Sequence, residues 1–463
     1  MSPLQSLQSI EIWATAVALI LYALYRRALP KPIPGIPHNK HAAQRLLGDA
    51  PDALAWKKKT GSLFLYIPEL ARQLNEPVFQ MFMQPLGKPW VILVDPYESH
   101  DIRTRRMQEF DRSIFFEQIF STLAPQFHVH MPTGDDWKAH RKLVSETMST
   151  RFLHDVAAPR MWSSAIALVE LWKTKAKLAA GRPWDAADDV FKGALDIVWA
   201  ATFGADIGST GAQAKFLERN GDLQLSSDID EVVVFPTGED PEDFTAILEL
   251  GQSEEAVKRK DKMIAEQLRA AYNKLIQLQA QDKLDLNKHF RSALDLIVAK
   301  EVQMASREGR AVDVTNQVIP DELFGFIIAG HDTTSTFICW TLKFLTDNRD
   351  AQHKLYGALC SAFVGVTCGQ SNARPVPSTT EISSTSIPYL EAVIEESGRL
   401  GLTSPATIRV TRCEPEILGH RVPAGIDVFL SNAGPGCVSP LVGEVDDAKR
   451  SKGGMDQKQK WGM

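Results

Sequence analysis

The sequence is poor in cysteine and has no excess of basic residues. Only five cysteines occur among 463 residues, and all of them follow residue 338. Their odd number and the absence of any C-x-x-C pair argue against a disulfide framework and against a structural zinc site. A formal net charge of −6 gives no electrostatic case for binding nucleic acid.

Three common catalytic signatures are also missing. There is no G-x-x-x-x-G-K-[ST] loop, no H-E-x-x-H and no G-x-S-x-G elbow. This excludes the usual nucleotide-hydrolysing, zinc-protease and serine-hydrolase motifs. What remains is a globular composition, 44% hydrophobic and 23% charged, on a chain long enough for one large domain or a few smaller ones.

The pattern of apolar residues predicts a mainly α-helical chain with a small β portion. A β-hairpin is expected within residues 77–95, where PVFQMFM and WVILVD flank the turn-like segment QPLGKP. Short strands are expected within residues 409–430. Long helices are expected over residues 162–179, 187–203, 254–280, 289–305 and 321–345.

The N-terminal region contains an apolar, uncharged run at residues 12–25 that ends at two arginines. We interpret residues 1–28 as a single-pass transmembrane anchor, with the basic residues holding the rest of the chain on the cytosolic side. A cleaved signal peptide is the alternative, but no basic residue precedes the run. Residues 29–40 are rich in proline and are expected to form a stiff extended hinge.

The predicted helix over residues 321–345 is apolar on nearly all sides except in its middle. There, AGHDTTS at residues 329–335 places a glycine and several polar side chains where the flanking sequence predicts burial. Burying an unpartnered polar group costs about 1–3 kcal/mol, so this break indicates that the polar groups have a use. The alternative is a kinked core helix in which the Thr333 hydroxyl bonds back to the Ala329 carbonyl.

Two further pairs of residues stand at helical spacing. Glu396 and Arg399 are three apart and share a helix face, either as a solvated surface pair or as a buried one. Trp137 and Arg141 are four apart at the start of another predicted helix. They either pack on one another or bind a shared anionic group.

In this order, the segments resemble the cytochrome P-450 family of haem-thiolate monooxygenases, most of all its membrane-anchored microsomal and fungal members. AGHDTT at residues 329–334 is similar to the family's (A/G)-G-x-(D/E)-T-(T/S) motif, and residues 396–399 are similar to its E-x-x-R pair. Residues 137–141 match its W-x-x-x-R pattern. Arg409 stands where the family often supplies an arginine to a haem propionate. The resemblance covers about residues 1–435.

The resemblance implies a cytochrome P-450-like fold and haem b, iron protoporphyrin IX, as the cofactor. The groove above the haem iron would be formed by Gly330, Asp332, Thr333 and Thr334. Thr333 would donate a hydrogen bond to dioxygen and Asp332 would help to relay protons. The haem propionates would be held by Trp137, Arg141 and Arg409. The Glu396–Arg399 pair would stabilise the fold behind the haem.

The thiolate ligand is the point at which the sequence departs from the family pattern. The family's ligand loop reads F-x-x-G-x-R-x-C-x-G, and no such loop occurs here. Cys437, in LSNAGPGCVSP, differs from that pattern at four positions, so we expect it in a plain turn rather than as the axial ligand. The chain is expected to end before the ligand loop. Residues 444–463 have little apolar content and are predicted to be a disordered tail.

The expected organisation is an anchor (1–28), a hinge (29–40), a haem monooxygenase-like domain that is incomplete at its C-terminal end (41–443), and the tail. The expected function is oxidation of a small apolar organic substrate with O₂ and electrons from an NADPH-dependent cytochrome reductase, in secondary metabolism. The body would face the cytosol from the endoplasmic reticulum membrane. The alternative is a truncated, inactive, membrane-tethered relative without thiolate-ligated haem.

The substrate pocket is expected to involve residues 110–130 and 205–245. Four aromatic residues in the first of these segments favour a sizeable apolar substrate, although core packing explains them equally well. They are Phe115, Phe116, Phe120 and Phe127.

Overall fold

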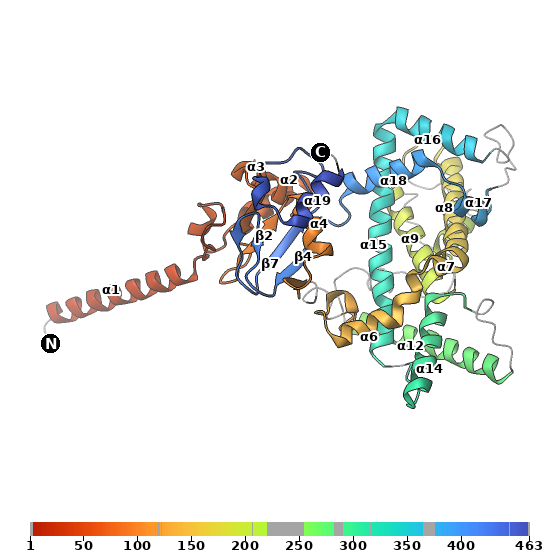
Figure 1. The fold of residues 1–463 in the computed structure, drawn as a ribbon, viewed down its shortest axis with the longest axis horizontal. Helices are drawn as coiled ribbons and strands as arrows, with labels where there is room; N and C mark the ends of the chain where they lie inside the picture. Colours follow the sequence, from red (N-terminus) through yellow and green to blue (C-terminus); the bar gives the residue numbers. More distant parts are fainter. Residues whose placement is uncertain are drawn as a thin grey trace. The chain divides into compact units, whose positions relative to one another are not determined.

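The chain divides into two compact units, each described by itself (Figure 1). The sheet unit comprises Met1–Phe115 and Ser404–Met463, and the helical unit comprises Phe116–Thr403. This computed structural model describes residues 3–115, 117, 121, 123–205, 207–219, 254–281, 290–314, 316–363, 376–443 and 445–461. The prediction of a mainly helical chain with a small β portion is confirmed.

A five-stranded mixed sheet forms the centre of the sheet unit. In spatial order its strands are β1 (Val78–Met81), β2 (Trp90–Leu93), β7 (Asp427–Ser431), β4 (Ala406–Thr411) and β3 (Phe110–Arg112). Strands β2 and β7 are parallel, and the other neighbours are antiparallel. A second small sheet pairs β5 (Glu416–Ile417) with β6 (His420–Arg421). The predicted hairpin and the predicted late strands are therefore confirmed.

Short helices surround this sheet, and one long helix precedes it. Their bounds are α1 (Pro3–Ala28), α2 (Ala50–Thr60), α3 (Tyr66–Leu74), α4 (Pro96–Thr104) and α19 (Lys452–Trp461). Helix α4 begins after Asp95, whose carboxylate accepts a hydrogen bond from the Glu98 N–H at 2.8 Å, and Pro96 occupies its first helical position.

The predicted anchor region is helical. Helix α1 has 26 residues and ends with Arg26 and Arg27 in its last turn. Several large apolar side chains on it are exposed, including Trp13 and Leu19. Within the described part of the chain, no helix is both long enough and apolar enough to cross a membrane. The transmembrane anchor stays a prediction.

The proline-rich hinge is fixed to the sheet by one glutamine. The Gln80 side-chain carbonyl on β1 accepts a hydrogen bond from the Ile33 N–H at 2.8 Å. Its amide donates to the carbonyls of Ile33 and Ile36 at 3.0 and 2.8 Å. Both isoleucine side chains are buried in the apolar cluster of the sheet unit. Residues 29–40 contain a turn, in which the Ile36 N–H donates to the Ile33 carbonyl at 3.3 Å, and the segment packs onto the sheet rather than standing free of it as a stiff extended hinge.

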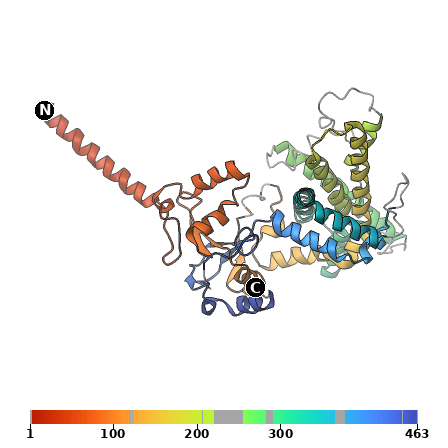
Figure 2. The same cartoon turned by 90° about the horizontal axis from the view of Figure 1, so that it is seen from above.

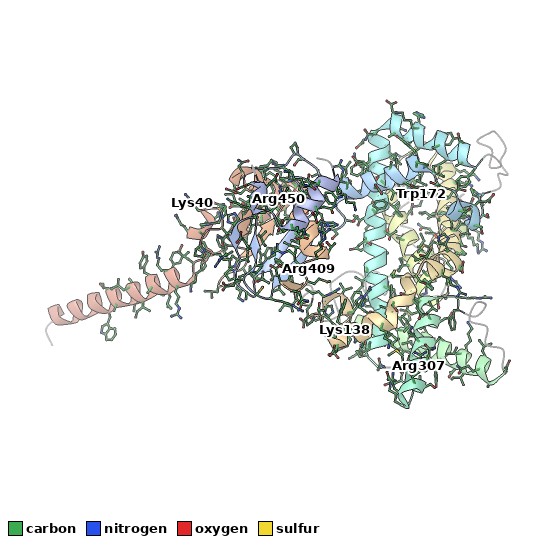
Figure 3. All side chains as sticks on the ribbon, in the orientation of Figure 1. Lys40, Lys138, Trp172, Arg307, Arg409 and Arg450 are labelled. Carbon is green, nitrogen blue, oxygen red and sulfur yellow. The ribbon has the colours of Figure 1, made fainter. Side chains whose placement is uncertain are left out.

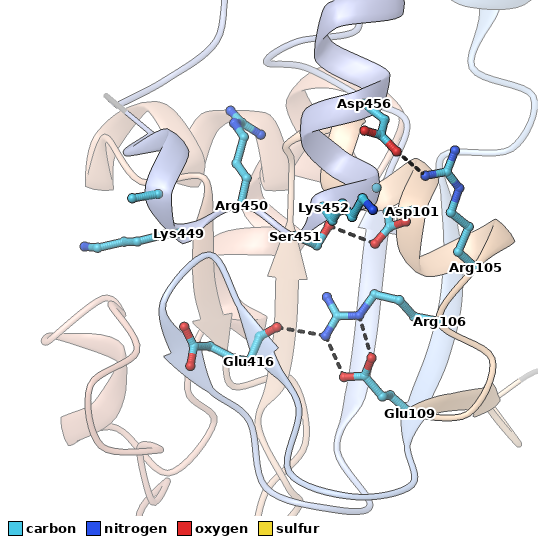
Figure 4. A pocket seen from close by; sticks show the side chains of 12 residues that line it. Asp101, Arg105, Arg106, Glu109, Glu416, Lys449, Arg450, Ser451, Lys452 and Asp456 are labelled. Atoms are coloured by element: carbon cyan, nitrogen blue, oxygen red, sulfur yellow. Dashed lines mark hydrogen bonds and ion pairs between the residues drawn. The ribbon is translucent and has the colours of Figure 1, made fainter.

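The polar tail differs from its prediction, because half of it folds as helix α19 against α4 (Figure 4). Two glycines make this contact possible. A Cβ atom on Gly453 would lie 1.6 Å from the Asp101 Oδ1 atom, and one on Gly454 would lie 2.6 Å from a Glu98 carboxylate oxygen. The two glycines allow the backbone of α19 to approach α4 closely. From composition alone, the same glycines favour a disordered tail.

Buried polar contacts hold α19 in place. The Arg450 guanidinium donates to the Asp95 carboxylate at 2.9 Å, and both side chains are almost fully buried. The Ser451 hydroxyl, just before α19, donates to carboxylate oxygens of Glu98 and Asp101 at 2.9 and 2.8 Å. A segment with few apolar residues is therefore ordered through charge-assisted hydrogen bonds.

The helical unit contains the long helices. Its described helices are α6 (Asp135–Val144), α7 (Thr150–Phe152), α8 (Ala158–Ala179), α9 (Ala186–Phe203), α10 (Ser209–Arg219), α12 (Glu254–Ala280), α14 (Ala293–Glu308), α15 (Val318–Asp347), α16 (Arg349–Ala362), α17 (Thr379–Ser384) and α18 (Pro388–Gly401). Every helix expected from apolar periodicity is present. Between residues 205 and 245, the predicted pocket region lies largely outside the described residues.

Helix α15 is the central element of the helical unit, and Figure 2 shows it nearly end-on among its neighbours. It packs most extensively on α9. Buried side chains on α15, such as Phe324 and Ile327, join Trp199 and Phe203 of α9 in one apolar cluster. This packing, together with the Asn316 side chain that accepts from the first N–H groups, positions the helix that carries the polar break.

Candidate functional site

The polar segment in the middle of α15, residues 329–335, is exposed on one face of the helix. Asp332 and Thr333 are exposed, and so is Ala329 one turn earlier. The Thr333 hydroxyl donates a hydrogen bond to the Ala329 carbonyl at 2.6 Å. The backbone bond considered from the sequence is therefore formed. Because a hydroxyl oxygen can also accept, this bond leaves Thr333 able to accept a hydrogen bond from the open side.

The other side of the same break is used for packing against α9. A Cβ atom on Gly330 would lie 2.9 Å from a methyl group of Val198, so glycine permits the two helices to approach. The buried His331 ring bonds to the Phe191 carbonyl at 3.0 Å, and burial lowers the pKa of His331. The buried Ser335 hydroxyl donates to the His331 carbonyl at 2.8 Å. These polar groups are satisfied within the helical unit, whereas Asp332 and Thr333 face outward.

Helix α6 carries the two residues predicted to hold an anionic group. It begins after Gly134, with two aspartates in its first turn, which suits the positive end of the helix dipole. Trp137 is half-buried and Arg141 is exposed. The described residues provide no hydrogen bond or ion pair for the Arg141 guanidinium. In Figure 3, the labelled Lys138 marks this helix.

A buried carboxylate that the sequence reasoning missed joins α6 to α15. The Glu322 side chain is fully buried. It accepts hydrogen bonds from Nδ1 of His128 at 2.6 Å and Nδ1 of His140 at 2.9 Å, and from the His128 backbone N–H at 3.0 Å. Burial raises the pKa of Glu322, but the hydrogen bonds from His128 and His140 outweigh burial and leave that pKa below its usual value. The carboxylate is therefore ionised at neutral pH.

Arg409 lies in the sheet unit, on β4 (Figure 3). Its side chain is half-buried and donates to the Ile408 carbonyl at 3.2 Å. Burial, and then the nearby charge of Arg103, lower the pKa of Arg409. Arg103, on α4, donates to the Asn432 side-chain carbonyl at 3.0 Å. Two neighbouring guanidinium groups form a local excess of positive charge that suits an anion. The sequence reasoning had identified only Arg409.

The predicted ion pair of Glu396 and Arg399 is formed on α18. The Arg399 guanidinium donates to both carboxylate oxygens of Glu396, at 2.7 and 2.6 Å. The hydrogen bonds from Arg399 lower the pKa of Glu396. The side chains are 55% and 44% exposed, so the pair is a solvated one and the buried alternative is not observed.

Cys437 lies in a tight turn that follows β7. The Gly434 carbonyl accepts hydrogen bonds from the N–H groups of Cys437 and of the two residues after it, at 2.8–3.2 Å. Its side chain is half-buried. This agrees with the expected plain turn. Cys360 is disulfide-bonded, which the low and odd number of cysteines does not predict.

The aromatic residues considered for a substrate pocket have separate surroundings. Phe127 is buried, and its ring lies where a Cβ atom on Gly325 would be, within 2.2 Å. Phe115, in the sheet unit, contacts the rings of Trp90 and Phe429. Phe127 therefore serves core packing, and Phe115 is a half-buried member of an aromatic cluster. Phe116 and Phe120 lie outside the described residues.

The comparisons with known proteins agree with the sequence motifs. The family model described as "Cytochrome P450" matches residues 53–434. The chain belongs to the cytochrome P450 family. It is 38% identical to the cytochrome P450 monooxygenase GME11363 of Pestalotiopsis microspora, covering 99% of this chain and 82% of that protein. It is 33% identical to the cytochrome P450 monooxygenase TRI13 of Fusarium sporotrichioides, covering 94% and 78%.

The fold of this cytochrome P450 also agrees with solved structures. The haem domain of cytochrome P450DA has a TM-score of 0.61 and 18% sequence identity, over 87% of this chain and 76% of that one. The protein is therefore an oxidoreductase of the monooxygenase type, with haem as the family's cofactor and with an organic substrate and a redox partner. Nothing in these comparisons supports the alternative of an inactive relative.

The donor groups in the structure fit much of what haem needs. In the helical unit, Arg141 has an exposed guanidinium without a described partner. In the sheet unit, Arg409 lies beside a second arginine. Each of these groups by itself is suitable chemistry for a carboxylate such as a haem propionate. The exposed face at Ala329 and Thr333 combines a small side chain with a hydroxyl. We assign no axial ligand, because Cys437 lies in a turn that does not match the family's ligand loop.

Proposed function

We propose that this cytochrome P450 inserts one atom of O₂ into a small apolar organic substrate in fungal secondary metabolism, with electrons from an NADPH-dependent cytochrome reductase. The observation that carries the proposal is the division of the α15 break into a packed side and an exposed side. Asp332 and Thr333 occupy the exposed side of a helix whose first turns are buried. The fungal origin of both relatives supports the metabolic context.

Each assigned residue has a distinct chemical role in this proposal. When bound, haem supplies the activation of dioxygen. The guanidinium groups of Arg141 and Arg409 would bind propionate carboxylates, and the Trp137 indole N–H would donate to such a carboxylate. The Thr333 hydroxyl, which donates to the Ala329 carbonyl at 2.6 Å, would donate its hydrogen bond to dioxygen instead. The Asp332 carboxylate takes a proton from solvent and passes it on.

The role of the exposed α15 face can be tested on the full chain with haem and reductase. Wild type should oxidise its substrate only with NADPH and O₂, and Asp332→Asn should slow turnover by ~10²-fold, as expected for loss of a proton-transfer group. The ferrous–CO difference spectrum should be the same in both proteins. Equal turnover of the variant, or NADPH-independent oxidation by wild type, would refute the assignment.

A second part of the proposal concerns location. We propose that α1 attaches the protein to the endoplasmic reticulum membrane as a single-pass anchor, with the body in the cytosol. Support comes from the exposed apolar side chains of α1 and from the two arginines that end it. Expressed in yeast, the full chain should remain in the membrane fraction after carbonate extraction, whereas Trp13→Asp/Leu21→Asp should be extracted. Extraction of the wild-type chain would contradict the anchor.

A further inference from the structure

A buried polar cluster in the helical unit has no place in the function described so far. Glu322 of α15 receives hydrogen bonds from His128 and His140, and these three residues are between 0% and 8% exposed. His128 belongs to a short 3₁₀ helix, and His140 lies in the middle of α6. Burying a carboxylate is costly unless it is well hydrogen-bonded, so this arrangement stabilises one particular docking of α6 on α15.

Glu322 lies on the same face of α15 as Thr333. Glu322 and Thr333 are eleven residues apart, which in an α-helix is about 20° beyond three full turns and about 16 Å along the axis. The two residues therefore share one face. At Glu322 this face is covered by α6, and at Thr333 it is exposed. The contact thus fixes the position of α6 along the face that carries the proposed oxygen groove.

The same contact fixes the rotation of α6 about its own axis. His140 and Arg141 are adjacent, so they project about 100° apart, and Trp137 lies between these two directions. With the His140 ring held by Glu322 at 2.9 Å, the directions of Trp137 and Arg141 are set as well. Leu143 and Val144 bury the end of α6 in the core, but apolar contacts fix the rotation less strictly than a hydrogen bond does.

The segment before α6 is attached to the same part of α15. The Asp321 carboxylate accepts from the Gln126 N–H at 2.7 Å, and Lys260 of α12 donates to the Leu123 carbonyl at 2.6 Å. Phe127 fills the space beside Gly325. Glu322 is therefore the central member of a set of contacts that connects residues 123–144 to the first turns of α15.

We infer that Glu322 is a positioning residue for haem binding, which acts through His140 to aim Trp137 and Arg141 at a haem propionate. This inference rests on the proposed role of these two residues. Loss of the carboxylate should weaken haem binding without removing any group that touches haem. A residue that orients a ligand-binding group typically contributes about 10- to 100-fold in affinity.

The experiment compares the full chain with Glu322→Gln, His140→Leu, Arg141→Ala and the double variant Glu322→Gln/Arg141→Ala. A glutamine amide presents N–H groups to at least one of the imidazole N–H donors, so the cluster is weakened without a large change in volume. Haem-free protein is titrated with haemin, and amide hydrogen exchange is followed in peptides from α6 and α9. Glu301→Gln is the matched control, since Glu301 is a buried carboxylate of the same unit that bonds to Arg310 rather than to α6.

We expect Glu322→Gln and His140→Leu to raise exchange in α6, to leave α9 unchanged, and to weaken haem binding roughly tenfold. The double variant should bind haem more weakly than Arg141→Ala, but by less than the loss that Glu322→Gln causes alone, because Arg141 is one of the two groups that Glu322 aims. Unchanged exchange in α6, or additive losses in the double variant, would overturn the inference. If Arg141→Ala binds haem normally, the proposed role of Arg141 fails. In that case the inferred role of Glu322 in aiming Arg141 also fails. Increased amide hydrogen exchange in α6 would still show that Glu322 holds α6 on α15.

Discussion

The Thr333 hydroxyl of α15 donates its hydrogen bond to the Ala329 carbonyl one turn earlier, at 2.6 Å. Both residues are exposed, so this bond can be exchanged for one to a bound group without breaking the core. This geometry is compatible with a hydroxyl that only bends the helix and with one that donates to dioxygen. The two interpretations differ in whether removing the hydroxyl lowers the amount of product formed per NADPH consumed.

Replacing Thr333 by alanine should uncouple electron use from product formation. The side chain is exposed, so stability should change by less than about 0.5 kcal/mol. The product formed per NADPH consumed should fall about tenfold or more, since a placed donor in proton transfer is worth about 10²–10⁴-fold in rate. Thr333→Ser retains the hydroxyl and should keep most of the coupling. Equal coupling in Thr333→Ala and wild type would leave only the helix-bending role.

Gly330 should tolerate no side chain, because its Cβ would lie 2.9 Å from a methyl group of Val198. We expect Gly330→Ala to destabilise the helical unit by about 1–3 kcal/mol, as overpacking typically does. Val198→Ala, introduced together with it, should restore part of the loss. Gly357, on exposed α16, has no atom within 4 Å of a Cβ and provides the control. There, alanine should stabilise by about 0.5–1 kcal/mol in urea unfolding.

The exposed Glu396–Arg399 pair should contribute little to folding. Glu396→Ala is expected to cost about 0.2–1 kcal/mol, and the effect should diminish in 1 M salt because the pair is solvated. A useful comparison is the pair of Lys175 and Asp189, which is 2.7 Å apart and almost fully buried. Asp189→Ala should cost about 3–5 kcal/mol. A large, salt-independent loss in Glu396→Ala would indicate that the pair is shielded in the folded protein.

The sequence predicts elements well where a regular local pattern extends over many residues. The helix expected over residues 254–280 is found at Glu254–Ala280, since apolar spacing along one face needs no knowledge of the partner. Helix α19 was missed because its stability comes from charged hydrogen bonds and from glycines that fit against α4. Such contacts leave no periodic trace in the sequence.

In the candidate site, too, the residues of short motifs could be predicted, whereas contacts between residues far apart in the sequence could not. Short motifs correctly identified Thr333 as a polar residue on a core helix and placed Glu396 and Arg399 in contact. Whether that pair is buried depends on tertiary packing, and spacing cannot show it. Glu322 was missed because its partners lie 182 and 194 residues away, and a single glutamate near the start of a helix reads as an ordinary first-turn acid.

The Glu322 contact should also make stability depend on pH in a defined direction. The groups that face this carboxylate are His128 and His140, with Asp321 beside it in the chain. Its pKa in the folded protein is below the usual value, so its stabilising effect is complete above the unfolded pKa of about 4.3 and is lost as pH falls through the folded pKa. We therefore expect wild type to exceed Glu322→Gln in free energy of unfolding by about 1–3 kcal/mol at pH 7, and the difference to shrink below about pH 4. Urea unfolding at a series of pH values measures this difference directly. If the difference in free energy of unfolding stayed constant down to pH 3, ionisation of Glu322 would not stabilise the folded protein.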